Sequence, residues 1–152
     1  MNEARLVVDP STISLRASAP ATGDIALVVR GVVFLVAGWN DFVVVILEAW
    51  LNAIVRIFRN ASDAERVHFM EGPYAVDMTR LNTGAIQLRA LDRPERERAV
   101  VEVMPLVLAE NAVSAAEGVV AFGRARGHQA TDFERLETAL AALRKEVANL
   151  KN

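Results

Sequence analysis

The chain has 152 residues, contains no cysteine, and carries 17 basic and 19 acidic residues, for a formal net charge of −2. This length suits a single domain over residues 1–152, and the lack of cysteine excludes disulfides, thiolate metal sites and cysteine nucleophiles. The near-neutral charge, without a block of like charges, gives no reason to expect nucleic acid or anionic lipid as a partner.

The first forty residues favour β-strands. Arg5–Val8 and Thr12–Arg16 are short β-prone runs separated by a turn that contains proline. Asp24–Arg30 and Val32–Val36 are predicted as two further strands that meet near Gly31, either as a hairpin or as one strand with a bulge.

A helix is predicted from Asp41 to Arg59, where apolar residues return at three- and four-residue spacing. Asn40 or Asp41 is placed to cap its first turn. Trp39, just before the cap, either packs on Val43 as a hydrophobic staple or stays partly exposed as an anchor for a partner.

Residues 25–58 are apolar enough to raise the question of a membrane segment. Charged residues interrupt the stretch, and its longest uncharged run, Gly31–Asn40, is about half of the roughly 20 residues that a spanning helix needs. The first residues, from Met1 to Ser11, also lack the basic and then apolar pattern of a secretion signal. We therefore expect a soluble protein of the cytoplasm with no membrane partner.

A second group of strands is predicted from residue 66 onward. Arg66–Met70 and Tyr74–Thr79 form a hairpin around the turn Glu71–Pro73, and Ala85–Arg89 continues it as a meander.

Residues 92–104 fit either a strand or a helix. Asp92–Glu95 has the form of a helix start, whereas Ala99–Val103 is rich in β-branched residues. We choose one more strand here, followed by a helix from Pro105 to about Arg126, because proline suits a first helical turn.

The C-terminal segment is predicted to be a second amphipathic helix. Thr131–Glu134 has the form of a capping box, and apolar residues follow at alternating spacings of three and four: Phe133, Leu136, Leu140, Leu143, Val147 and Leu150. This apolar stripe either packs the helix on its own domain or forms the seam of a homodimer.

No catalytic, cofactor-binding or metal site is predicted. His68 and His128 are isolated, and no serine lies in a G-x-S-x-G setting. A carboxylate enzyme without a recognisable motif stays an alternative, because acid–base groups are often distant in sequence.

Three segments of the chain carry a resemblance. They are Phe34–Ile46 (FLVAGWNDFVVVI) with the nearby Trp50, Val67–Tyr74 (VHFMEGPY), and Gly127–Leu136. Together they resemble small bacterial α+β proteins with a W-x-D-F helix start and an F-M-D/E-G-P-Y hairpin, similar in architecture to immunity proteins of polymorphic and contact-dependent toxin systems. The resemblance implies a non-catalytic protein that neutralises a cognate toxin domain by stoichiometric binding.

The predicted fold is α+β, with an antiparallel meander of about six or seven strands covered on one face by the 41–59 helix and two C-terminal helices. The predicted partner-binding residues are Trp39, Asp41, Glu71 and Tyr74, because they flank a helix start and a turn. The alternatives are a self-associating structural protein that dimerises through its C-terminal helix, and a small-ligand-binding protein or enzyme.

Overall fold

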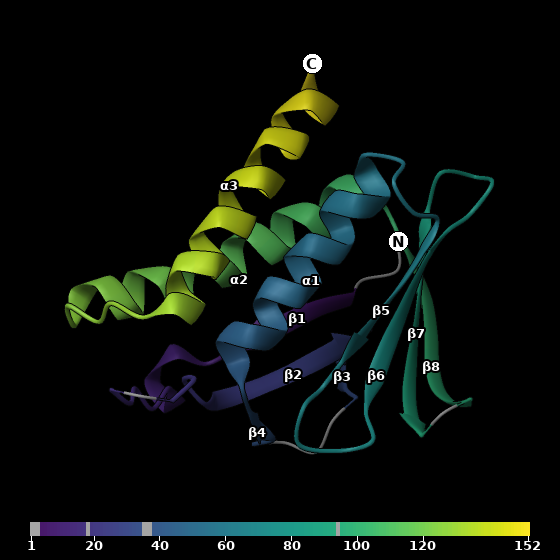
Figure 1. Ribbon diagram of the computed structural model, residues 1–152. Coiled ribbons are helices and arrows are strands. Elements are labelled where there is room, and N and C mark those ends of the chain that lie inside the picture. The colour runs from purple at the N-terminus through teal and green to yellow at the C-terminus, as the bar shows by residue number, and fades with distance from the viewer. Residues whose placement is uncertain (1–3, 18, 35–37, 94) are drawn as a thin grey trace.

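The structure is a computed structural model that describes residues 4–17, 19–34, 38–93 and 95–152. Its elements in chain order are β1 (Ala4–Val8), the 3₁₀ helix η1 (Pro10–Thr12), β2 (Gly23–Val29), β3 (Val32–Val33), β4 (Asn40–Asp41), α1 (Val43–Phe58), β5 (Ala64–His68), β6 (Ala75–Arg80), β7 (Ile86–Arg93), β8 (Arg96–Val103), α2 (Pro105–Ala125) and α3 (Thr131–Lys151). The three α-helices lie together, with β1 and β2 beneath them and β5 to β8 beside them (Figure 1). The predicted α+β class is confirmed.

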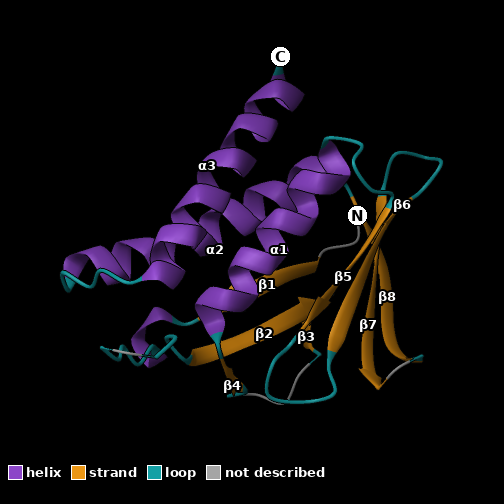
Figure 2. Ribbon diagram, viewed as in Figure 1, coloured by secondary structure: helices purple, strands orange, loops and turns teal. Residues whose placement is uncertain are grey.

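The strands form two separate antiparallel sheets of four strands, so the single meander of six or seven strands is not what the chain adopts. In the first sheet β2 pairs with β1, β3 and β4, whereas the second is a meander in the order β5-β6-β7-β8. Figure 2 shows the two groups of strands at an angle to each other. The reason for the division is α1, which takes the chain out of the first sheet after β4 and returns it at β5.

The predicted strand Thr12–Arg16 is wrong. Asp9 Oδ1 accepts a hydrogen bond from the Ser11 backbone N–H (3.0 Å), and Pro10 occupies the first turn, so the chain forms η1 instead. An isolated bridge between Ser14 and Thr22 and a hydrogen bond from the Asp24 N–H to Thr12 Oγ1 (2.8 Å) join this region to β2 and the residues before it.

The hairpin alternative near Gly31 is confirmed. β2 and β3 are antiparallel, and Arg30 and Gly31 have φ values of 52° and 78°, which suit a tight two-residue hairpin turn. The second predicted strand, Val32–Val36, is observed only as Val32–Val33, and residues 35 and 36 lie outside the described residues.

The central helix α1 lies in the middle of the hydrophobic core. It contacts β2, β5, α2 and α3, and Trp50 on its buried face is 1% exposed. The apolar spacing that predicted a helix over 41–59 is therefore confirmed, with the helix itself running from Val43 to Phe58.

The strand chosen for residues 92–104 from the sequence is confirmed: residues 92–93 end β7, Glu95 is in a turn, and β8 covers Arg96–Val103, with residue 94 outside the described residues. β7 and β8 form a hairpin with register shifts near Leu91, and α2 begins at Pro105 as predicted. Within the described residues α2 alone is long and apolar enough to cross a membrane, a property shared by core helices of soluble proteins, and Leu108, Ala112 and Val119 on it are buried in the fold.

The apolar stripe of α3 packs inside the chain. Phe133, Leu136, Leu140 and Leu143 are buried where α3 meets α1 and α2, whereas Leu150 at its end is 50% exposed. The predicted capping box does not form, because the helix already includes Thr131 and its N-cap residue is Ala130.

Candidate functional site

A buried aspartate joins the start of α1 to the turn between β5 and β6. Asp41 is 0% exposed and is the one buried charged side chain among the residues that the structure describes. Its Oδ1 accepts a hydrogen bond from the Phe42 N–H (2.7 Å). Its Oδ2 accepts bonds from the Trp39 Nε1–H (3.1 Å) and from the backbone N–H groups of Met70 (3.1 Å) and Glu71 (3.2 Å). These donors replace the water that a carboxylate loses on burial.

This arrangement links the two sheets. Asp41 belongs to β4, which pairs with β2 in the first sheet, while its carboxylate holds the β5–β6 turn of the second sheet. The prediction that Asn40 or Asp41 caps α1 is wrong: the N-cap residue is Phe42, and no side chain makes the capping bond. The carboxylate is directed to the turn instead.

Aromatic rings pack beneath the same turn. The rings of Trp39 and Tyr74 meet edge to face with centroids 4.9 Å apart, and the ring of Phe34 lies 6.0 Å from that of Tyr74. A Cβ atom at Gly72 would lie 2.8 Å from Cη2 and 2.9 Å from Cζ2 of Trp39, so glycine is required for the indole to approach. The W-N-D-F and F-M-E-G-P-Y segments, far apart in sequence, thus form one packed unit.

The turn presents a surface to solvent. Met70 is 56% exposed, Glu71 and Pro73 are exposed, and Trp39 and Tyr74 are half-buried. We call these five residues the turn surface. It combines apolar and aromatic groups with a backbone that Asp41 holds in place.

A shallow cavity of about 170 Å³ adjoins the turn surface and is lined by Arg66, His68, Gly72, Pro73, Tyr74, Ala75, Leu91 and Arg93. Arg66 pairs with Asp77 on β6 (2.5 Å), and this hydrogen-bonded guanidinium lowers the pKa of the Asp77 carboxyl. Arg93 has no ion pair with any described residue. Arg93 is therefore the charged group that the cavity offers beside the turn surface.

Three of the four predicted partner-binding residues, Trp39, Glu71 and Tyr74, lie on the turn surface. Asp41 lies buried beneath it, so its role is to position the others. Met70 was not among the predicted residues, although its place immediately before the Glu-Gly-Pro turn is the sequence signal that puts it at the tip.

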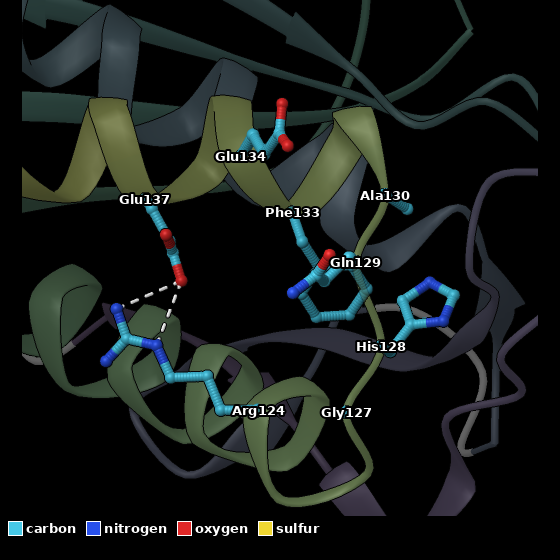
Figure 3. Close-up of a pocket in the computed structure, with 8 residues that line it drawn as sticks. All are labelled: Arg124, Gly127, His128, Gln129, Ala130, Phe133, Glu134 and Glu137. Carbon is cyan, nitrogen blue, oxygen red and sulfur yellow. Dashed lines mark hydrogen bonds and ion pairs between the residues drawn. The ribbon is translucent and has the colours of Figure 1, made fainter.

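A second cavity, of about 420 Å³, lies where α2 connects to α3 (Figure 3). Arg124 and Glu137 form an ion pair at one end of it (3.0 Å), and the ring of His128 meets Phe133 edge to face at the other (5.2 Å). Glu134 points away from His128 in this view. The polar groups thus do not converge, and no group of three potential metal ligands occurs in the described part of the chain.

Comparisons of the chain with protein-family models, with curated proteins and with solved structures found no match.

Proposed function

We propose that this protein binds another protein through the turn surface, and that it is an immunity-type protein of the cytoplasm that neutralises a toxin domain by stoichiometric, non-catalytic binding. The observation that carries the proposal is the Asp41 carboxylate, which holds the backbone of the turn at the exposed Met70 and also the indole of Trp39, whose ring packs on Tyr74.

A rigid turn favours binding because little freedom is lost when the partner docks. Aromatic residues and methionine are enriched at the centres of protein interfaces, and the strongest contacts are often made by a few anchors of this kind. A standard interface covers about 800 Å² on each partner, so the contact has to extend from the turn surface onto neighbouring residues. Arg93 in the lining of the adjoining cavity suits an acidic side chain of the partner.

The assignment to the immunity type is supported by the sequence resemblance. Two of the three resembling segments, Phe34–Ile46 and Val67–Tyr74, are those that build the turn surface and its support. The third, Gly127–Leu136, forms the connection between α2 and α3 and the start of α3.

The test is to co-express the chain with the toxic domain of a neighbouring gene, and then to measure binding by calorimetry with a matched pair of variants. Met70→Asp places a charge on the turn surface, and Met104→Asp places the same charge on a methionine of similar exposure (56% and 51%) before α2. Met104 is the N-cap residue of α2, where aspartate is favourable, so this control should fold at least as well as the parent.

We expect one-to-one binding that Met70→Asp weakens by about thirtyfold, the effect of losing an interface anchor, and that Met104→Asp leaves unchanged. Equal binding by both variants would remove the turn surface from the interface. Growth arrest despite co-expression, or turnover of a small substrate by the purified chain, would overturn the immunity function.

Self-association through the C-terminal helix is the competing proposal. Leu140 and Leu143 are buried inside the chain, at 3% and 0% exposure, so a dimer formed by the intact fold has to use the exposed end near Leu150. A dimer in light scattering that Leu150→Asp converts to a monomer would favour this alternative.

A further inference from the structure

β1 lies at the edge of the first sheet, and some of its backbone groups face away from β2. The hydrogen bond from Asp9 N–H to Asp24 O (3.4 Å) continues the β1–β2 register by one pair. Bonded and non-bonded pairs alternate along an antiparallel ladder. The backbone N–H and C=O groups of Val7 therefore bond to β2. Those of Leu6 and Val8 point the other way, toward the free edge of the sheet.

A hydrogen bond on the other side of β2 agrees with this assignment. Phe34 N–H donates to Leu27 O (2.8 Å), so Leu27 faces β3, and its partner in β1 is Leu6. Within the described ranges, no hydrogen bond satisfies the backbone groups that Leu6 and Val8 turn outward.

A groove of about 340 Å³ lies along this edge, between β1 and α2. It is lined on the strand side by Arg5, Leu6, Val7, Val8 and Pro10, and on the helix side by Asn111, Ser114, Ala115 and Gly118. The helix residues follow at spacings of three and four, so they form one stripe. The stripe is about 10 Å long, which matches three or four residues of extended chain.

Gly118 keeps this groove open. A glycine inside a helix destabilises it by about 1 kcal/mol relative to alanine, so its presence needs a reason. Gly123 of the same helix has one, because a Cβ there would lie 2.6 Å from Cε1 of Phe133. A Cβ at Gly118 would meet only Cγ of Pro10, at 4.0 Å. Packing within the chain does not require this glycine, and its lack of a side chain widens the groove.

The outer strands of the second sheet carry features that discourage the pairing of a further strand. β8 carries the exposed charges Arg96, Glu97 and Arg98 and has register shifts against β7, and β5 is linked to α1 by the ion pair between Arg56 and Glu65 (2.5 Å). Charges and bulges of this kind discourage further strand pairing.

We propose that the groove between β1 and α2 binds an extended segment of another protein, which joins the first sheet as an additional strand. The backbone of the segment pairs with the outward N–H and C=O groups of Leu6 and Val8, as in other cases of strand addition. Its side chains that face α2 are small, because Ser114, Ala115 and Gly118 leave a narrow space. This site belongs to the first sheet and does not depend on the turn surface.

The test uses a phage-displayed library of random peptides selected on the full-length chain, with the most enriched peptide then synthesised and titrated by calorimetry. Gly118→Leu fills the groove and raises helix propensity, so it should fold well and weaken binding by at least about tenfold. Ala121→Leu, on an exposed position of the same helix outside the groove, is the matched control and should bind like the parent.

A second readout reports on the backbone. Amide exchange at Leu6 and Val8 should slow by at least about tenfold when the peptide is added, and Val8→Pro, which removes one outward N–H, should weaken binding. The proposal is overturned if no peptide is enriched over an unrelated protein, if Gly118→Leu binds as well as the parent, or if exchange is unchanged. A dimer of the chain that Val8→Pro disrupts would assign the edge to a second copy and would also overturn it.

Discussion

The two sheets differ in the surfaces that they turn to solvent. The second sheet carries ion pairs across its strands, with Arg66 to Asp77 at 2.5 Å and Arg89 to Glu97 at 2.9 Å. The first sheet instead exposes β-branched apolar residues, including Val33 at 43%. The second sheet thus presents paired charges to solvent. The first sheet instead retains apolar surface and outward backbone groups, which are features that another protein is able to bind.

Removing the carboxylate that joins the sheets should have the largest effect. Asp41→Ala leaves the N–H groups of Trp39, Met70 and Glu71 without their acceptor, and each buried unpaired donor is unfavourable by about 1–3 kcal/mol. We expect the free energy of unfolding to fall by about 3 kcal/mol or more, as measured by denaturant titration. Asp41→Asn keeps one acceptor oxygen and should lose less. A loss below about 1 kcal/mol for Asp41→Ala would show that water replaces the carboxylate and that the sheets are joined by packing alone.

The ion pairs of the second sheet should matter less, and their effect should depend on pH. Arg66 lowers the pKa of Asp77, so the folded state holds the carboxylate more strongly than the unfolded state, whose pKa is about 3.9. The resulting stability is present above that value and is lost as the pH falls through the lower pKa of the folded state.

Asp77→Asn is therefore expected to reduce the free energy of unfolding at pH 7 by about 0.5 kcal/mol, a modest effect because Arg66 is well exposed to solvent. The difference from the parent should shrink when unfolding is measured below about pH 4. Asp63→Asn is the control, since Asp63 is exposed and its side chain makes no ion pair within the described residues. A difference that stays constant down to acidic pH would mean that Asp77 acts through shape and not through charge.

Local patterns in the sequence predicted the elements well, but not their assembly. The apolar spacing around Trp50 predicted α1, and the Glu-Gly-Pro turn predicted the β5–β6 hairpin. Both predictions succeed because helix periodicity and turn chemistry act over a few residues. The division into two sheets depends on where α1 returns the chain, a long-range property that no local pattern carries. The strand predicted over Thr12–Arg16 was wrong for a related reason, since the side-chain hydrogen bond of Asp9 in the preceding turn outweighs the strand preference of these residues.

The candidate site was predicted in part for the same reason. Trp39, Glu71 and Tyr74 were expected at a surface because they flank a turn and a helix start, and they do lie together. Asp41 has the same sequence setting, yet it is buried, since its partners Met70 and Glu71 come from another part of the chain. Whether a carboxylate near a helix start faces solvent or holds a distant loop is decided by tertiary contacts.

The smallest effect is expected on the apolar face of the first sheet. Val33→Thr replaces a 43% exposed valine by a residue of the same β-branched shape, so the free energy of unfolding should change by no more than about 0.5 kcal/mol. Val29→Thr, in the buried row of the same sheet, is the matched control, and it should lose about 1 kcal/mol or more because its hydroxyl enters the core. Denaturant titration of both variants gives the comparison, and binding of a hydrophobic dye should fall only for Val33→Thr. A loss at Val33 as large as that at Val29 would mean that this face is covered in the isolated protein, and the contrast between the two sheets would then not hold.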